Sequence, residues 1–249
     1  MDKKAQVTLF VVISILVIVS VIVVLYLSGG IKLETSDSKN PNNFIDKCVK
    51  DALEPSVETI MKNGGRITPS LYKMYKDEYY NYLCYQKGYY ISCLNTHPML
   101  KTIVEAELKQ DTQEEVEKCF SDLKNLLETQ GYSVSDSSVE WSIKIVPGKV
   151  LVDIEKGYSI TKEGTTSSFA DFHPKLMSPL YELISVARDI VNQESQYCNF
   201  EYNGFMLLHP EYAIQRSSYD ESRLYIIQDR NSQKVFKFAV RSCALPPGI

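Results

Sequence analysis

The longest apolar run of the chain lies near its beginning. Residues 7–27 are almost all Val, Ile, Leu or Phe, and no charged residue occurs between Ala5 and Ile31. As a helix with a rise of about 1.5 Å per residue, this run would cover roughly 31 Å, which matches a hydrocarbon core of about 30 Å. The pattern predicts a transmembrane helix over residues 7–27, between a short N-tail (residues 1–6) and a polar tether (residues 28–43).

A cleaved secretory signal peptide is the alternative interpretation of this run. The apolar region of such a peptide is about 7 to 15 residues long and ends at a small-x-small site. Here the run is longer and ends in Tyr-Leu-Ser-Gly-Gly, so we expect a retained signal anchor. Lys3 and Lys4 precede the run, which favours a single-pass protein with a cytoplasmic N-terminus and its C-terminal domain outside the cell membrane.

The remaining residues, 44–249, alternate between helical and strand patterns and predict one extracytoplasmic α+β domain. We expect long helices over residues 44–61, 96–130 and 174–194. Asn42 or Asn43 is the expected cap of the first helix, and Pro55 is expected to kink or split it. The expected antiparallel hairpins and strands cover residues 139–154 with a Pro-Gly turn, and residues 158–162, 212–216, 224–228 and 235–240.

All six cysteines follow the apolar run, and none forms a C-x-x-C pair. An even set of cysteines in a translocated domain usually forms disulfides, whereas free thiols would suit a cytosolic domain. We therefore expect a disulfide-braced ectodomain. The pairings that we favour are one local, one between two helices and one across the last sheet: Cys84 with Cys93, Cys48 with Cys119, and Cys198 with Cys243.

Tyrosines are concentrated in residues 72–90. Tyrosine combines a broad apolar ring with a polar tip, which suits both a small core and a surface that binds sugars or proteins. Both interpretations stay open, and the candidate binding surface consists of Tyr72, Tyr75, Tyr79, Tyr80, Tyr82, Tyr85, Tyr89 and Tyr90.

Motifs of catalysis and cofactor binding are missing from the sequence. It has no nucleophile elbow, H-E-x-x-H, phosphate-binding loop or dinucleotide fingerprint. A triad of His173, Asp171 and a serine can be assembled, but such sets arise by chance among many serines. The histidines His97 and His173 each precede a proline at a helix start, which favours loop or capping roles. We therefore predict no catalytic, cofactor-binding or metal-binding residues, and no cofactor.

Charge excludes one class of partner. The whole chain carries −4 and residues 1–34 contribute +1, so the remainder carries −5. A mildly acidic domain is not suited to nucleic acid. The glutamates of residues 105–117 alternate with lysines at helical spacing, as on a solvated helix face, and have no calcium-loop spacing.

The segment Lys3-Lys4-Ala5-Gln6-Val7-Thr8-Leu9, followed directly by the apolar run, resembles the class III signal peptides of archaeal type IV pilins and related surface proteins. In that family a peptidase cuts before a Gln that follows a basic residue and a Gly or Ala. The resemblance implies processing between Ala5 and Gln6, with an apolar helix that stays attached and can pack in a filament. This chain has Phe10 where many such pilins carry Glu. The domain resembles uncharacterised archaeal surface proteins, which implies location without activity.

These observations predict a membrane-anchored structural or interaction protein of the cell envelope, a pilin-like subunit or an adhesin, and not an enzyme. Its expected partners are the lipid bilayer, copies of itself in a filament, or another envelope protein. The alternative is an envelope enzyme or assembly factor with a site of scattered residues. A pocket that gathers His97, His173 or His209 with carboxylates would favour that alternative.

Overall fold

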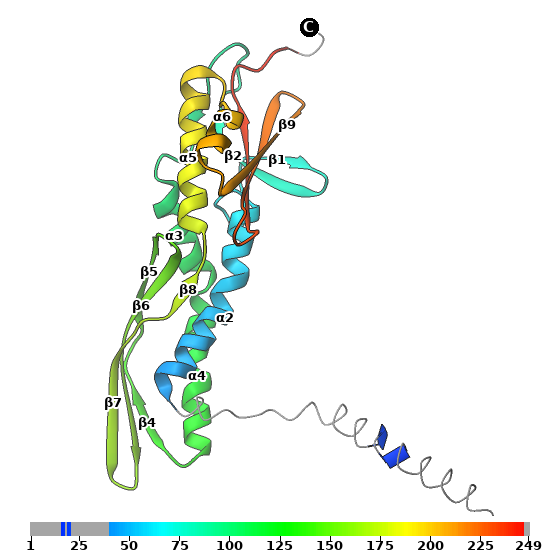
Figure 1. Ribbon diagram of the computed structural model, residues 1–249. Helices are drawn as coiled ribbons and strands as arrows, with labels where there is room; N and C mark the ends of the chain where they lie inside the picture. The colour runs from blue at the N-terminus through cyan, green and yellow to red at the C-terminus, as the bar shows by residue number, and fades with distance from the viewer. Residues whose placement is uncertain (1–15, 18, 21–39, 247–249) are drawn as a thin grey trace, which may run out of the picture. The chain divides into compact units, whose positions relative to one another are not determined.

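In a computed structural model of the chain, residues 16–17, 19–20 and 40–246 are described (Figure 1). The predicted span over residues 7–27 and the predicted processing site at Ala5 and Gln6 lie outside this part of the chain, except for four helical residues of the span. Among the described residues, no helix combines the length and hydrophobicity that crossing a bilayer requires. From Pro41 onward the described residues form one compact unit.

The first long helix of this unit is α2 (Pro41–Lys62). It begins before Asn42, so the predicted asparagine cap is wrong; proline suits the first turn because its φ is already helical. Pro55 lies inside α2 without dividing it. Its missing N–H would have bonded to the carbonyl of Asp51, and Asp51 is exposed to solvent, so the helix loses little there.

The second predicted helix is two helices, α3 (Leu100–Asp111) and α4 (Gln113–Thr129). The break is at Thr112, whose hydroxyl donates to the carbonyl of Leu108 at 2.7 Å. The buried positions keep their helical spacing across Thr112, but the two helices have different neighbours: α3 packs against β5 (Glu140–Val146) and α4 packs mainly against α2. Thr96 is not the cap of α3, which begins four residues later.

A five-stranded antiparallel sheet is built around the long strand β6 (Lys149–Lys162). The predicted hairpin is confirmed, since β5 (Glu140–Val146) pairs with the first half of β6. Residues 158–162 continue β6 after an irregularity instead of forming a strand of their own. The remaining strands were not expected from the sequence: β4 (Ser133–Asp136), β7 (Thr165–Phe172) and β8 (Lys175–Met177).

A six-stranded sheet contains the tyrosine-rich segment and the C-terminal strands. Its order is β1-β2-β11-β10-β9, with β3 beside β2. The predicted C-terminal strands are confirmed, and the parallel pair β2–β11 joins them to the N-terminal half. The bounds are β1 (Tyr72–Tyr75), β2 (Glu78–Tyr85), β3 (Leu94–Asn95), β9 (Tyr212–Tyr219), β10 (Ser222–Asp229) and β11 (Val235–Arg241).

Helices cover one face of this sheet. The helix α5 (Leu180–Tyr197) packs against β10, β11 and β2, and α2 packs against β11 (Figure 1). The start of α5 corrects the prediction, because residues 174–179 include β8 instead of a first helical turn. The short helix α6 (Tyr202–Leu208) contacts β9. The main core lies between these helices and the two sheets.

Three disulfides brace the domain, and they join the pairs favoured from the sequence. Cys48–Cys119 links α2 to α4, and Cys84–Cys93 joins β2 to the segment just before β3. Cys198–Cys243 links the end of α5 to the segment that follows β11. The helices and the two sheets confirm the predicted mixed α+β class. Three disulfides are typical of an extracellular or otherwise oxidising compartment.

Candidate binding surface

The tyrosines of residues 72–90 form a buried group and an exposed group, and Tyr75 and Tyr85 are half-buried against the buried group. Tyr80 and Tyr82 lie on the face of the sheet away from α2 and α5, where they are only 2% and 6% exposed. They form a small second core with Leu224 and Ala239. Burial raises the pKa of Tyr80 to about 12, and the hydroxyls of Tyr82 and Ser222 share a hydrogen bond of 2.6 Å. This group is structural.

Tyr72 and Tyr79 belong to the exposed group. They lie on the opposite face of the β1–β2 hairpin, because successive side chains of a strand alternate. Their rings meet edge to face with centroids 4.9 Å apart, and both residues stay about two-fifths exposed, at 43% and 41%. The pair therefore presents a supported aromatic surface to solvent.

Paired charges surround the buried tyrosine group. Lys73 binds Asp220 at 2.5 Å and lies 5.0 Å from the ring centroid of Tyr219. Lys237 binds Glu78 at 2.6 Å. Each of these two cations therefore has an acidic partner.

The loop between β2 and β3 presents the most exposed part of the tyrosine-rich segment. The disulfide between the buried cysteines Cys84 and Cys93 encloses residues 85–92, which we call the loop and which include the last residue of β2. Tyr90 is 61% exposed and the neighbouring Ile91 is 52% exposed. Tyr90 has a φ of +60°, a left-handed conformation that a bulky residue seldom adopts. The loop thus presents two large apolar side chains in a specific backbone conformation.

Arg241 forms hydrogen bonds to the first half of this loop. One guanidinium nitrogen donates to the backbone carbonyls of Gln86 and Gly88. The other terminal nitrogen binds the carboxylate of Glu221 at 2.5 Å, and that carboxylate accepts from the hydroxyl of Tyr89 at 3.0 Å. The Arg241 side chain is itself buried. A guanidinium is suited to this task because its donors lie in a rigid planar fork.

The C-terminal segment holds the second half of the loop. The N–H of Tyr90 donates to the carbonyl of Ala244 at 3.0 Å, and the N–H of Cys243 donates to the carbonyl of Ile91 at 2.8 Å. The N–H of Cys93 donates to the hydroxyl of Ser242 at 3.1 Å. The backbone on both sides of the exposed side chains is therefore hydrogen-bonded to the rest of the domain.

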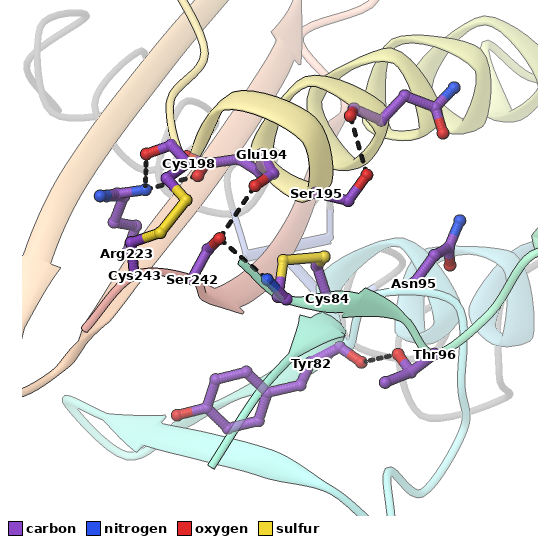
Figure 2. Close-up of a disulfide and its surroundings, with 12 residues drawn as sticks. Tyr82, Cys84, Asn95, Thr96, Glu194, Ser195, Cys198, Arg223, Ser242 and Cys243 are labelled. Carbon is purple, nitrogen blue, oxygen red and sulfur yellow. Dashed lines mark hydrogen bonds and ion pairs between the residues drawn. A yellow bond between two sulfur atoms is a disulfide. The ribbon is translucent and has the colours of Figure 1, made fainter. Parts of the chain in front are cut away.

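The layer beneath the loop contains a buried carboxylate. Figure 2 shows Glu194, at the end of α5, beside the Cys198–Cys243 disulfide. Its carboxylate accepts hydrogen bonds from Arg223 and from the hydroxyl of Tyr225 and is fully buried. The backbone carbonyl of Glu194 accepts from the Ser242 hydroxyl at 2.9 Å. Ser242 therefore links the Cys84–Cys93 loop to the end of α5.

The three histidines do not come together. His97 lies near Arg66 and Glu107, His173 is 3.3 Å from Asp153, and His209 is 3.5 Å from Glu211. Asp171 contributes to the same surface hollow as His173, but no serine joins them there. Among the described residues, no group of His, Cys, Asp and Glu has the arrangement of a metal site.

A groove of about 460 Å³ lies between α2, β8 and the first turn of α5. Its walls include Val57, Leu176 and Tyr212, with Glu182 and Asp229 among the acids. One carboxylate oxygen of Glu182 accepts from the N–H of Gly148 at 2.8 Å. None of the three histidines lines this groove.

Sequence reasoning found the tyrosines of this surface and missed the residues that position them. Arg241, Glu221 and Ser242 follow the loop by about 130 to 155 residues in the chain. No local pattern links them to it. No protein-family model matches the chain, and no curated protein is significantly similar to it.

Proposed function

We propose that the chain is a membrane-anchored interaction protein of the cell envelope, and that the loop of residues 85–92 contacts its partner. The observation that carries the proposal is that Tyr90 and Ile91 remain exposed although the backbone around them is fixed. A contact made by a pre-ordered loop loses little conformational entropy on binding. Exposed aromatic side chains on such a loop are typical anchors of protein interfaces.

The anchor is supported by the sequence. The uncharged run over residues 7–27 is long enough for one membrane crossing, and Lys3 and Lys4 favour a cytoplasmic N-terminus. The disulfides agree with a domain outside the cytoplasm, since thiols stay reduced in most cytosols. A pilin-like subunit would use the apolar run for assembly, whereas an adhesin would use the loop.

The place of the loop in the domain supports the adhesin-like role. Within the unit that begins at Pro41, the start of α2 contacts the part of the domain that contains α4 and β7, and the other end of α2 reaches β11. The loop lies beyond that second end, beside the end of α5 (Figure 1). The loop and the start of α2 at Pro41 therefore lie at opposite ends of the domain (Figure 1).

A site-specific photo-cross-linking experiment tests the role of the loop. A photoreactive phenylalanine analogue replaces Tyr90 in the full chain, expressed in its own cells. The matched control places it at Met177, which is 73% exposed in the other sheet. We expect a discrete adduct from position 90 that disappears when Ile91 is also changed to Asp. Identical adducts from both positions, or none from position 90, would contradict the proposal.

A further inference from the structure

The two sheets end in several edge strands, and most of these edges are protected. An unprotected edge presents unpaired N–H and C=O groups that can pair with another strand. In the six-stranded sheet, the edge strand β1 is protected because it is only four residues long and contains Lys73. The edge strand β9 is in contact with α6. In the other sheet, β8 has three residues and β4 contacts α4. The edge strand β5 contacts α3, and Glu105 accepts from the N–H of Ile145 at 2.8 Å.

The first part of β7 lacks all of these protections. The strand has eight residues, and the segment 165–170 contains neither a charge nor a proline. All of these residues are exposed except Phe169, which is half-buried. β7 lies at the outer side of the sheet, with β6 between it and β4 (Figure 1). Its contact with α2 is small.

The backbone of this segment directs alternate residues toward the open edge. Glu163 and Gly164 form the two-residue turn between β6 and β7, with φ values of +50° and +80°. The residues that flank such a turn, Lys162 and Thr165, face each other as a hydrogen-bonded pair. By the alternation of an antiparallel ladder, Thr166 and Ser168 point their N–H and C=O groups away from β6.

The side chains of these two residues are already occupied within the hairpin. The hydroxyls of Thr166 and Thr161 are 2.8 Å apart, and those of Ser168 and Ser159 are 3.0 Å apart. What β7 offers to a partner is therefore its backbone, and the ligand that fits such an edge is another extended strand.

We propose that β7 pairs antiparallel with β7 of a second copy of this chain, with the two-fold axis at Ser168. This register pairs the whole segment 165–171 with itself. It places Thr165 opposite Asp171 and Thr166 opposite Ala170, so no two like charges face each other. Ser168, whose backbone groups point outward, then meets Ser168 of the second copy, as an antiparallel ladder requires. The contact is isologous, the commonest form of dimer symmetry.

This surface is separate from the loop of residues 85–92, so the two proposals can fail independently. The loop lies in the six-stranded sheet beyond the C-terminal end of α2, whereas β7 lies in the other sheet. Dimerisation through β7 would present two such loops on one particle and increase the avidity of binding to a repeated partner.

A cysteine on the axis tests the register. In an antiparallel hydrogen-bonded pair the Cα atoms are about 5.5 Å apart, which suits a disulfide. We expect the full chain with Ser168→Cys to form a disulfide-linked dimer in the absence of reductant. The control is Ser133→Cys, another exposed serine, on β4 at the other edge of the sheet, which should stay monomeric on a non-reducing gel. Cross-linking of both variants to the same extent, or of neither, would overturn the proposed register.

A charge on the edge tests the pairing itself. We expect the full chain in detergent to sediment as a dimer and the Ser168→Lys variant as a monomer, while Ser133→Lys stays dimeric. Equal circular dichroism spectra of the two variants would show that both fold. A monomeric unmodified chain, or a dimer that persists in Ser168→Lys, would overturn the proposal. A Ser168→Cys chain that cross-links to a different protein would overturn it in favour of a heterologous strand.

Discussion

Arg241 and Glu221 form the ion pair that connects the six-stranded sheet to the loop of residues 85–92, with an N–O distance of 2.5 Å. Hydrogen bonds from Arg241 and then from Tyr89 lower the pKa of the Glu221 carboxyl. Because Arg241 also donates to two carbonyls of the loop, this buried side chain contacts three groups that belong to a segment about 150 residues away in the chain or are bound to it.

Replacing Arg241 with Lys should loosen the loop, because an ammonium group lacks the fork that reaches both the carboxylate and the carbonyls. We expect a loss of about 1 to 3 kcal/mol in the free energy of unfolding. Hydrogen exchange at the amides of Tyr90 and Cys93 should become faster. The control is the exposed Arg230→Lys, which should leave exchange unchanged. Equal protection of the loop amides from hydrogen exchange in both variants would show that Arg241 does not stabilise the loop.

The three disulfides should stabilise the domain to different degrees. In the chain-entropy model a longer loop gives a larger effect, and the separations are 71, 45 and 9 residues. Removing Cys48–Cys119 by a double Ala substitution should cost about 4 kcal/mol, and removing Cys84–Cys93 about 2.5 kcal/mol. Chemical denaturation of the two variants measures the difference. A reversed order would show that loop length does not govern these bonds.

The buried carboxylate of Glu194 depends on Arg223. Changing Arg223 to Ala leaves a buried charge without its partner, which typically costs about 3 to 5 kcal/mol. The double variant Arg223→Ala with Glu194→Gln should recover part of that loss, since the charge itself is then removed. A double-mutant cycle by thermal unfolding measures the coupling. Additive effects of the two substitutions would mean that the pair is not coupled.

His97 should make the stability of the domain depend on pH. Burial, and secondarily the nearby charge of Arg66, lower its pKa below the value of about 6.5 expected in the unfolded chain. The unfolded chain therefore binds a proton at a higher pH than the folded domain does. The stabilisation is present above about pH 6.5 and is lost as the pH falls through the lowered value.

Unfolding measured at pH 7.5 and pH 5.5 tests this expectation. The unmodified chain should lose more stability between these two values than a His97→Gln variant. The carboxyls of Asp136 and Glu58, whose pKa values are lowered by hydrogen bonds from Lys156 and Lys234, act in a more acidic range and do not interfere. An equal loss in both chains would exclude His97 as the source.

The elements that the sequence predicted are those that bury one face. The residues of α2 with helical spacing, such as Val49, Leu53 and Val57, are buried, as are alternate residues of β5 and β6. β7 escaped prediction because most of it buries neither face, so its Ser and Thr residues have no hydrophobic period. Thr112 gave no signal of a break because the buried positions Leu108, Thr112 and Val116 keep helical spacing across it.

The candidate surface was predictable only in part. The tyrosine content marked the segment, but the sequence could not separate Tyr80 and Tyr82 from Tyr90. That separation depends on which face of β2 meets Leu224 and on where the Cys84–Cys93 disulfide turns the chain. Both are contacts between residues far apart in the sequence.

The central claim, an anchored domain outside the cytoplasm, is tested most directly by labelling intact cells with a membrane-impermeant maleimide. The full chain carries Ser138→Cys, an exposed position in the domain. We expect Ser138→Cys to be labelled in intact cells and the six native cysteines to stay unlabelled. Labelling of Ser138→Cys only after permeabilisation, or labelling of the native cysteines, would contradict the account.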